Sequence, residues 1–191
     1  MNAPARHATP FVLALVGPRR SGKDTIAAML GLPTFPIAAP LKDGVATMFG
    51  IPRADLDSDA KDRPLRGTHG TGTTPRELMQ RIGTDVAMPA LGRRVWVDQC
   101  VRAIRASGLP AAAVPDVRFP HEYEALREAF GDRLTVVRVE RPGVARDAPA
   151  DAHASETAWT DVPADRVIVN SGTLRDLAWR AMTVGARFPR S

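Results

Sequence analysis

The sequence is poor in cysteine, in aromatic residues and in long apolar runs. Its 191 residues include one cysteine, Cys100, which excludes an internal disulfide and a cysteine-based metal cluster. Only ten residues are aromatic, so there is little material for the stacking platforms that bind single-stranded nucleic acid. The longest apolar run is Phe11–Val16, whereas a membrane helix needs about 20 apolar residues. We therefore expect no membrane partner and a reducing, cytoplasmic compartment.

Lysine is also scarce, and arginine supplies the basic charge. Lys23, Lys42 and Lys61 are the only lysines among 26 basic residues, and 21 acidic residues leave a formal net charge of +5. The planar guanidinium group suits bidentate binding of phosphate and carboxylate, although a biased base composition of the gene explains the excess equally well. The arginines are spread along the chain rather than grouped. Nucleotides therefore account for the charge as well as nucleic acid does, and we do not expect nucleic acid as the partner.

Patterns typical of strands alternate with patterns typical of helices. This alternation predicts an α/β fold with a mainly parallel sheet flanked by helices. The expected strands cover residues 11–16, 34–39, 111–114, 134–139 and 167–169. The expected helices cover a segment after Gly22 and residues 41–49, 74–86, 95–104, 120–130 and 173–184.

Three segments have no apolar period. Residues 1–10 lack the hydrophobic core of a signal peptide, and we expect them to form a disordered tail. Residues 55–74 and 147–165 are rich in charged and turn-forming residues, so we expect flexible loops there. The rest of the chain, residues 11–191, is expected to fold as a single domain.

A helix start stands out at Thr74. Thr74 can accept a hydrogen bond as the N-cap, Pro75 suits the first helical position, and Glu77 completes a capping box. The apolar stripe expected to face the core is made of Leu78, Met79, Ile82 and Val86.

The segment Gly17–Lys23 matches G-x-x-x-x-G-K between a buried strand and a helix. Glycines allow the backbone to curl so that its N–H groups surround phosphate oxygens, and the helix N-terminus adds a favourable dipole. The side chain of Lys23 could then bridge the outer phosphates of a nucleotide. The pattern favours a phosphate site over a glycine-rich turn that carries a surface lysine.

One position departs from the usual motif. Asp24 follows Lys23 where a serine or threonine usually ligates Mg²⁺, and the hydroxyl is displaced to Thr25. Three interpretations stay open. Asp24 holds the metal directly or through water, Thr25 reaches it, or Asp24 only stabilises the helix N-terminus.

A second group of polar residues follows the strand at 111–114. Asp116 and Arg118 alternate along extended backbone, and Glu122 lies at the start of the next helix. Acidic residues at the C-terminal ends of parallel strands lie at the ligand-binding edge of an open sheet. These residues favour recognition of a substrate with phosphate and hydrogen-bond donors, although an ordinary salt-bridged helix start is the alternative.

The order of motifs along the chain resembles that of phage-type deoxynucleoside monophosphate kinases. The motifs are GPRRSGKDT at 17–25, PLKD at 40–43, RELMQ at 76–80 with GTD at 83–85, WV at 96–97, VPDVR at 114–118 with HE at 121–122, VERPG at 139–143, HASE at 153–156, and Asn170 with GTL at 172–174. A phosphate loop alone is common to many families, whereas this ordered series is far more specific.

The resemblance implies the P-loop nucleoside-monophosphate-kinase fold and transfer of the ATP γ-phosphoryl group to a deoxynucleoside 5′-monophosphate, with Mg²⁺. The positions that match the ATP phosphate site are Gly17, Arg20, Ser21, Gly22, Lys23, Asp24 and Thr25, of which Asp24 and Thr25 are the metal candidates. The positions that match the substrate site are Arg19, Arg63, Arg76, Gly83, Thr84, Trp96, Asp116, Arg118 and Glu122. The cations expected to act in catalysis are Lys23, Arg19 and Arg118.

The resemblance also implies a mobile substrate flap near residues 55–74 and a lid near 142–165. His153, Ser155 and Glu156 match the lid motif without an assigned role. A homodimer is compatible with the family, and a phage-encoded enzyme would work in the host cytoplasm.

Several alternatives remain beside this interpretation. Trp96 suits either base stacking or a helix-start core position, and Arg76 with Gln80 suits either substrate binding or a solvated helix face. Lys42 suits either the acceptor phosphate or the surface. The rival functions are another small-molecule P-loop kinase, of the phosphomevalonate-kinase kind, and a non-catalytic nucleotide- or DNA-binding protein.

Overall fold

The computed structural model describes residues 9–65, 72–143, 153–186 and 188. The chain divides into two compact units, which we call the sheet unit (residues 1–36 and 100–191) and the helical unit (residues 37–99). The prediction of a single domain over residues 11–191 stays a prediction. Within the described ranges, no helix is long and apolar enough to cross a membrane.

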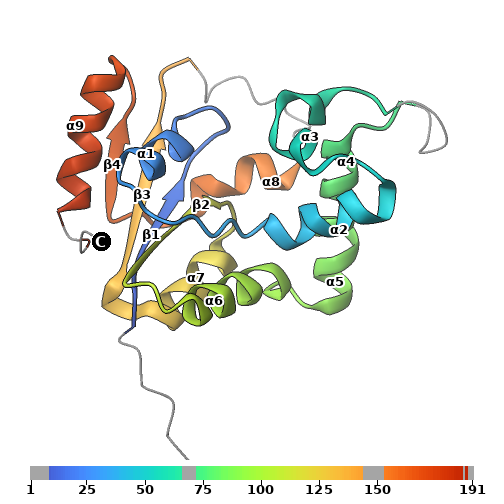
Figure 1. Cartoon of the computed structure of the whole chain (residues 1–191), viewed down its shortest axis with the longest axis horizontal. Helices are drawn as coiled ribbons and strands as arrows, with labels where there is room; N and C mark the ends of the chain where they lie inside the picture. Colours follow the sequence, from blue (N-terminus) through green and yellow to red (C-terminus); the bar gives the residue numbers. More distant parts are fainter. Residues whose placement is uncertain (1–8, 66–71, 144–152, 187, 189–191) are drawn as a thin grey trace, which may run out of the picture. The chain divides into compact units, whose positions relative to one another are not determined.

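The sheet unit is built on four parallel strands in the order β2-β1-β3-β4 (Figure 1). The strands are β1 (Phe11–Val16), β2 (Ala111–Val117), β3 (Leu134–Glu140) and β4 (Arg166–Val169). From Val12 to Val16, β1 is completely buried, because it lies between two strands and under helices on both faces. The predicted parallel α/β architecture is confirmed.

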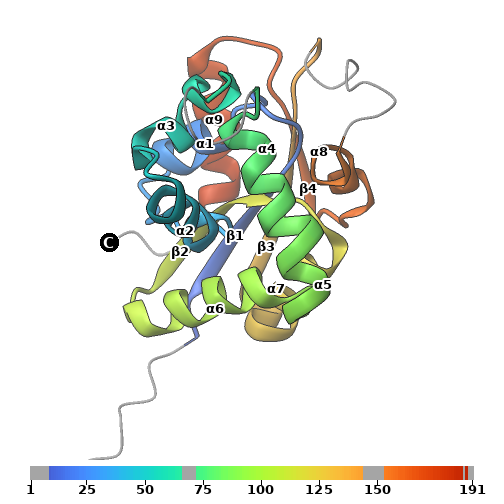
Figure 2. The same cartoon turned by 90° about the vertical axis from the view of Figure 1, so that its right-hand side faces the viewer.

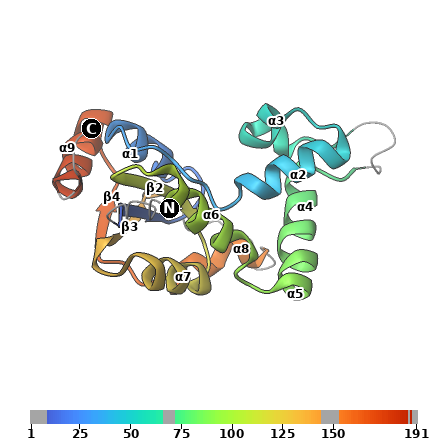
Figure 3. The ribbon, with the colours of Figure 1, turned by 60° about the horizontal axis from the view of Figure 1, so that its bottom comes forward.

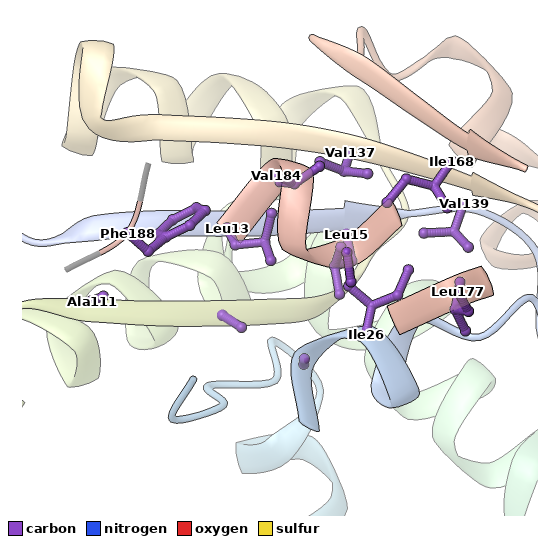
Figure 4. Close-up of a cluster of buried hydrophobic side chains, with 13 residues drawn as sticks. Leu13, Leu15, Ile26, Ala111, Val137, Val139, Ile168, Leu177, Val184 and Phe188 are labelled. Carbon is purple, nitrogen blue, oxygen red and sulfur yellow. The ribbon is translucent and has the colours of Figure 1, made fainter. Parts of the chain in front are cut away.

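Helices cover both faces of this sheet. They are α1 (Lys23–Met29), α6 (Val95–Ser107, which begins before the unit boundary), α7 (Pro120–Phe130), α8 (Ala154–Thr157) and α9 (Leu174–Gly185), with short 3₁₀ turns η3 (Gly131–Arg133) and η4 (Ala158–Asp161). Leu13, Leu15 and Ile26 pack with residues of α9 in one buried cluster (Figure 4). Helix α7 lies on the other side of the sheet (Figure 3).

The helical unit contains α2 (Ala39–Phe49), α3 (Arg53–Asp57), the 3₁₀ turn η1 (Asp59–Asp62), α4 (Pro75–Gln80), the π-helix η2 (Arg81–Ala87) and α5 (Met88–Leu91). Its small core consists of Val45, Ile51 and Leu56, with partly buried apolar residues of α2 and α4 around them. The segments α4, η2 and α5 follow one another without a break and form one rod (Figure 2).

The capping box at the start of α4 is confirmed. Thr74 Oγ1 accepts a hydrogen bond from the Glu77 amide at 3.2 Å, and the Glu77 carboxylate accepts one from the Thr74 amide at 2.8 Å. The predicted stripe is wrong at Val86, which is 61% exposed. The π-helix has more residues per turn than an α-helix, so it rotates the buried face to Gly83 and Ala87.

Two predictions of extended or irregular structure need correction. The expected strand at 34–39 is wrong, since only Thr34 forms a bridge, to Ala113, before α2 begins. Pro36 has no N–H group to offer a strand ladder. The segments expected to be loops hold α3 and η1 in one case and α8 and η4 in the other. Residues 1–8, 66–71 and 144–152 lie outside the described ranges, and motion of the flap and lid stays a prediction.

Candidate active site

The loop between β1 and α1 lies at the point where the chain connections diverge. From β1 the chain continues to β2, which lies on one side of β1 in the sheet. On the other side of β1 lies β3, and from β3 the chain continues to β4, farther out on that same side. Ligands of open parallel sheets bind at the C-terminal ends of strands at such a switch point. The sequence therefore places Gly17–Lys23 where a ligand site is expected.

Two glycines give this loop its shape. Gly17 has a φ of 140°, and a Cβ atom there would collide with the carbonyl oxygen of Val139 in β3. Gly22 has a φ of 107° and is the N-cap of α1, with the side chain of Asn170 close by. Arg20 adopts a φ of 60°, which is uncommon for a residue with a side chain. The tight path requires glycine at 17 and 22.

Residues after β3 and β4 fasten the loop. The side-chain amide of Asn170 donates to the carbonyl of Ser21 at 2.9 Å, and the Arg141 guanidinium donates to the carbonyl of Arg20 at 3.4 Å. Ser21 is fully buried, and its backbone amide donates to Pro18 within the loop. The sequence did not indicate that the Asn170 side chain binds the loop; its place directly after the last strand was the only signal.

Lys23 is the first residue of α1, and its side chain folds over the loop. Its ammonium group donates to the carbonyls of Gly17 at 2.9 Å and Pro18 at 2.7 Å. Burial, with a smaller contribution from the positive charge of Arg118, lowers the pKa of Lys23 to about 8 against the opposing effect of Asp24, Asp116 and Glu156. The loop, the end of β2 and α8 thus contribute to one electrostatic environment.

A hollow of about 380 Å³ adjoins the loop. Its lining residues are Arg20, Gly22, Lys23, Asp24, Thr25, Arg141, Asn170, Gly172, Leu174 and Leu177. Cationic side chains and loop backbone form one part of the lining, and leucines of α9 form another. This combination suits a ligand that is anionic at one end and apolar at the other.

The turn between β2 and α7 carries the second predicted group. β2 extends to Val117, beyond the predicted end at 114, and its register against β1 shifts next to Pro115, which cannot donate to the ladder. Asp116 therefore lies within β2, near the C-terminal end of the strand. Arg118 follows it, and its guanidinium forms an ion pair with Glu156 of α8 at 3.5 Å.

Glu122 is buried in the first turn of α7 and binds the backbone of the β2–α7 turn. Its carboxylate accepts hydrogen bonds from the backbone amides of Arg118 at 2.7 Å and Phe119 at 3.0 Å. Burial, with a smaller contribution from the charge of Asp116, raises the pKa of Glu122 from 4.5 to about 7 against the opposing effect of the two backbone hydrogen bonds. The carboxylate therefore shapes the turn, and its contact with a substrate stays a prediction.

The remaining substrate candidates belong to the helical unit. Arg76 pairs with Asp62 at 2.5 Å, and the indole N–H of Trp96 donates to the carbonyl of Gly83 at 3.0 Å. Gly83 is buried against Leu41, and a Cβ atom there would require the Leu41 side chain to shift. Thr84 is half-buried and Arg63 is exposed, whereas Arg19, Asp116, Arg118 and Glu122 belong to the sheet unit. Sequence reasoning did not find Asp62 as the partner of Arg76.

The donor set at the loop fits a magnesium ion that binds mainly through phosphates. Within the ranges the structure describes, no three His, Cys, Asp or Glu side chains converge on one point. Mg²⁺ usually takes only one or two protein oxygens and completes its shell with phosphates and water. Asp24 and Thr25 line the same hollow as Lys23 and supply a carboxylate and a hydroxyl.

The parallel sheet, the loop after its first strand and the adjoining hollow define a P-loop nucleotide-binding protein. The family model "Deoxynucleotide monophosphate kinase" matches residues 71–180, and the chain belongs to this family. The match begins after the phosphate loop, so the loop and the family match are separate observations. Neither rival function is favoured by the match.

Relatives from viruses agree with this assignment. The chain is 27% identical over 181 residues to a putative deoxynucleotide monophosphate kinase of Acanthamoeba polyphaga mimivirus, a match that covers 86% of this chain and 91% of that protein. It is 36% identical over 105 residues to the deoxynucleotide monophosphate kinase of Enterobacteria phage T4, which covers 53% of this chain and 41% of the phage enzyme. A crystal structure from Thermus thermophilus has the same fold, with a TM-score of 0.50, 19% identity and coverage of 96% of this chain and 100% of that one.

Proposed function

We propose that this chain transfers the γ-phosphoryl group of ATP to a deoxynucleoside 5′-monophosphate. The bond between the γ-phosphorus and the β–γ bridging oxygen breaks, an oxygen of the monophosphate forms the new bond, and the products are ADP and a deoxynucleoside diphosphate. The observation that carries the proposal is the joint environment of Lys23 and Arg118, two cations from the phosphate loop and the β2–α7 turn. Two phosphate groups must meet between such cations for transfer to occur.

In this proposal the donor site is the phosphate loop with its hollow. Backbone amides at the start of α1 and the ammonium of Lys23 bind the phosphates, and residues near Gly172 and Leu174 contact the adenine. Asp24 and Thr25 would hold Mg²⁺, which when bound neutralises charge on the transferred group. The loose transition state spreads charge over phosphate oxygens, so positioning and fixed cations do most of the work.

The acceptor site in this proposal includes Arg118 and Arg19, whose guanidinium groups neutralise the monophosphate. The acceptor oxygen is already anionic, so no general base is required. Asp116 would accept hydrogen bonds from the substrate. The family resemblance adds residues of the helical unit to this set, and these are Arg63, Arg76, Gly83, Thr84 and Trp96. A lid near 142–165 would keep water from taking the phosphoryl group.

A coupled assay of ADP release tests the proposal. The purified chain is supplied with Mg-ATP and, in turn, with dAMP, dCMP, dGMP and dTMP, and the diphosphate product is identified by chromatography. We expect turnover with at least one monophosphate, well above the hydrolysis of ATP alone. Folded protein that turns over none of the four would contradict the proposed function.

A further inference from the structure

The ion pair between Arg118 and Glu156 joins two segments that are far apart in the sequence. Arg118 Nη1 lies 3.5 Å from Glu156 Oε1, and the two side chains are 41% and 25% exposed. Glu156 belongs to the motif at 153–156, to which the sequence assigns no role. The pair therefore gives a residue of this motif a contact with a proposed substrate-binding cation.

The backbone around Glu156 is held by several hydrogen bonds. The indole N–H of Trp159 donates to the Glu156 carbonyl at 3.0 Å. Farther along, Arg138 of β3 donates to the carbonyls of Thr160 at 3.2 Å and Val162 at 2.7 Å, and Val162 is completely buried. The segment that carries Glu156 is thus bound to the sheet by hydrogen bonds, which fix the position of the backbone that carries its carboxylate.

The charges near Lys23 explain why a carboxylate is needed at this place. Lys23 and Arg118 carry the same sign and repel each other, and this repulsion adds to burial, the larger cause, in lowering the pKa of Lys23. Glu156 interacts favourably with both cations. A guanidinium has five N–H donors, which is more than one carboxylate can occupy, so a pair with Glu156 is compatible with binding of a phosphate by the same group.

We propose that Glu156 is a positioning residue whose carboxylate holds the Arg118 guanidinium near Lys23, in the orientation that binds the acceptor phosphate. This inference rests on the proposed function. It predicts that Glu156 acts on the monophosphate through Arg118 and has little influence on ATP.

The first experiment compares Glu156→Gln with Glu124→Gln, a matched control on the exposed face of α7. With saturating Mg-ATP and a varied monophosphate, we expect Glu156→Gln to raise the KM for the monophosphate by about five- to tenfold, the scale of a charge-pair coupling. The KM for ATP and the melting temperature should stay within error of the wild-type values, as should all parameters of Glu124→Gln. Glu156→Asp, which keeps the charge, should recover part of the loss.

The second experiment places Glu156→Gln in an Arg118→Ala background and measures monophosphate binding by calorimetry, at a temperature where circular dichroism shows every variant folded. If Glu156 acts through Arg118, the second substitution adds nothing to the first. The same loss in both backgrounds would mean that Glu156 binds the substrate directly and would overturn the inference. An active wild-type enzyme with an unchanged KM in Glu156→Gln would overturn it alone, whereas a wild-type chain without turnover would remove the proposed function and the inference together.

Discussion

The two units hold their candidate residues in different ways. In the sheet unit, three of these side chains bind backbone groups: Lys23 donates to two loop carbonyls, Asn170 donates to the carbonyl of Ser21, and Glu122 accepts from two amides. Arg118 differs, because it pairs with the side chain of Glu156. In the helical unit, the basic side chains Lys42 and Arg76 bind carboxylates, in the pairs Lys42–Asp57 and Arg76–Asp62, although Trp96 binds the carbonyl of Gly83. Backbone partners cannot move independently of the fold, whereas ion pairs near the surface contribute little and rearrange easily. We infer that phosphate chemistry depends on the first unit, and adaptation to the base on the second.

The largest effect is expected from Lys23→Ala, which removes the cation of the phosphate loop. Loss of a preorganised charge of this kind lowers kcat by about 10²–10³-fold. Lys61→Ala, in η1, is the control and should keep the wild-type rate. Steady-state kinetics with circular dichroism checks both. A folded Lys23→Ala variant that keeps the wild-type rate would show that the phosphate site has been placed wrongly.

Gly17→Ala should give the next largest effect, because the new Cβ atom would meet the carbonyl oxygen of Val139. A φ of 140° adds strain, so we expect a loss of about 2–4 kcal/mol in the free energy of unfolding. Gly31→Ala is the matched control, since Gly31 also has a positive φ but open space around it, and it should cost only about 1 kcal/mol. Urea denaturation measures both, and equal losses would contradict the close approach of the loop to β3.

Glu122 predicts a pH dependence of stability. Its pKa is about 7 in the folded protein and 4.5 in its ordinary state, so between these values the folded state binds more protons. The contribution of Glu122 to the free energy of unfolding is therefore fully present below about pH 4.5, and it is lost as the pH rises through about 7. Glu122→Gln should flatten this pH dependence, and at pH 8 its free energy of unfolding should exceed that of the wild type by about 1–3 kcal/mol. Urea titrations at several pH values measure it, with Glu124→Gln as the control; an unchanged slope would mean that Glu122 is not buried as a carboxylate.

The smallest effect is expected from Asp62→Asn, which breaks the ion pair with Arg76 in the helical unit. A partly exposed pair contributes only about 0–1 kcal/mol, and salt screens it. The free energy of unfolding should therefore change by less than about 1 kcal/mol at low salt and by nothing measurable at high salt. A loss as large as that of Gly17→Ala would remove the contrast between the two units.

Local patterns in the sequence predicted most of the sheet unit. The phosphate loop and the helix Pro120–Phe130 follow from short-range rules, because glycine, proline and capping residues act on their own backbone. The same rules predicted the capping box at Thr74 in the helical unit. The family resemblance contributed the list of site residues, which the structure distributes over both units.

Long-range contacts were beyond such reasoning. The pairing of Arg118 with Glu156 joins residues 38 positions apart, and nothing in either segment indicates the other. The burial of Glu122 depends on how the turn folds over it. The exposure of Val86 depends on a π-helix, for which the sequence between Arg81 and Ala87 gives no local signal.

The π-helix also sets how the rod from Pro75 to Leu91 responds to a change of length. A π-turn holds an additional residue that an ordinary helix would lack, and it behaves as an insertion absorbed within the rod. Deleting one residue between Arg81 and Ala87 would restore regular winding and leave the residues beyond it near their present positions around the axis. A one-residue deletion within the π-helix should therefore keep the side chains that α5 presents, whereas the same deletion within α4 would turn them by about 100° around the axis.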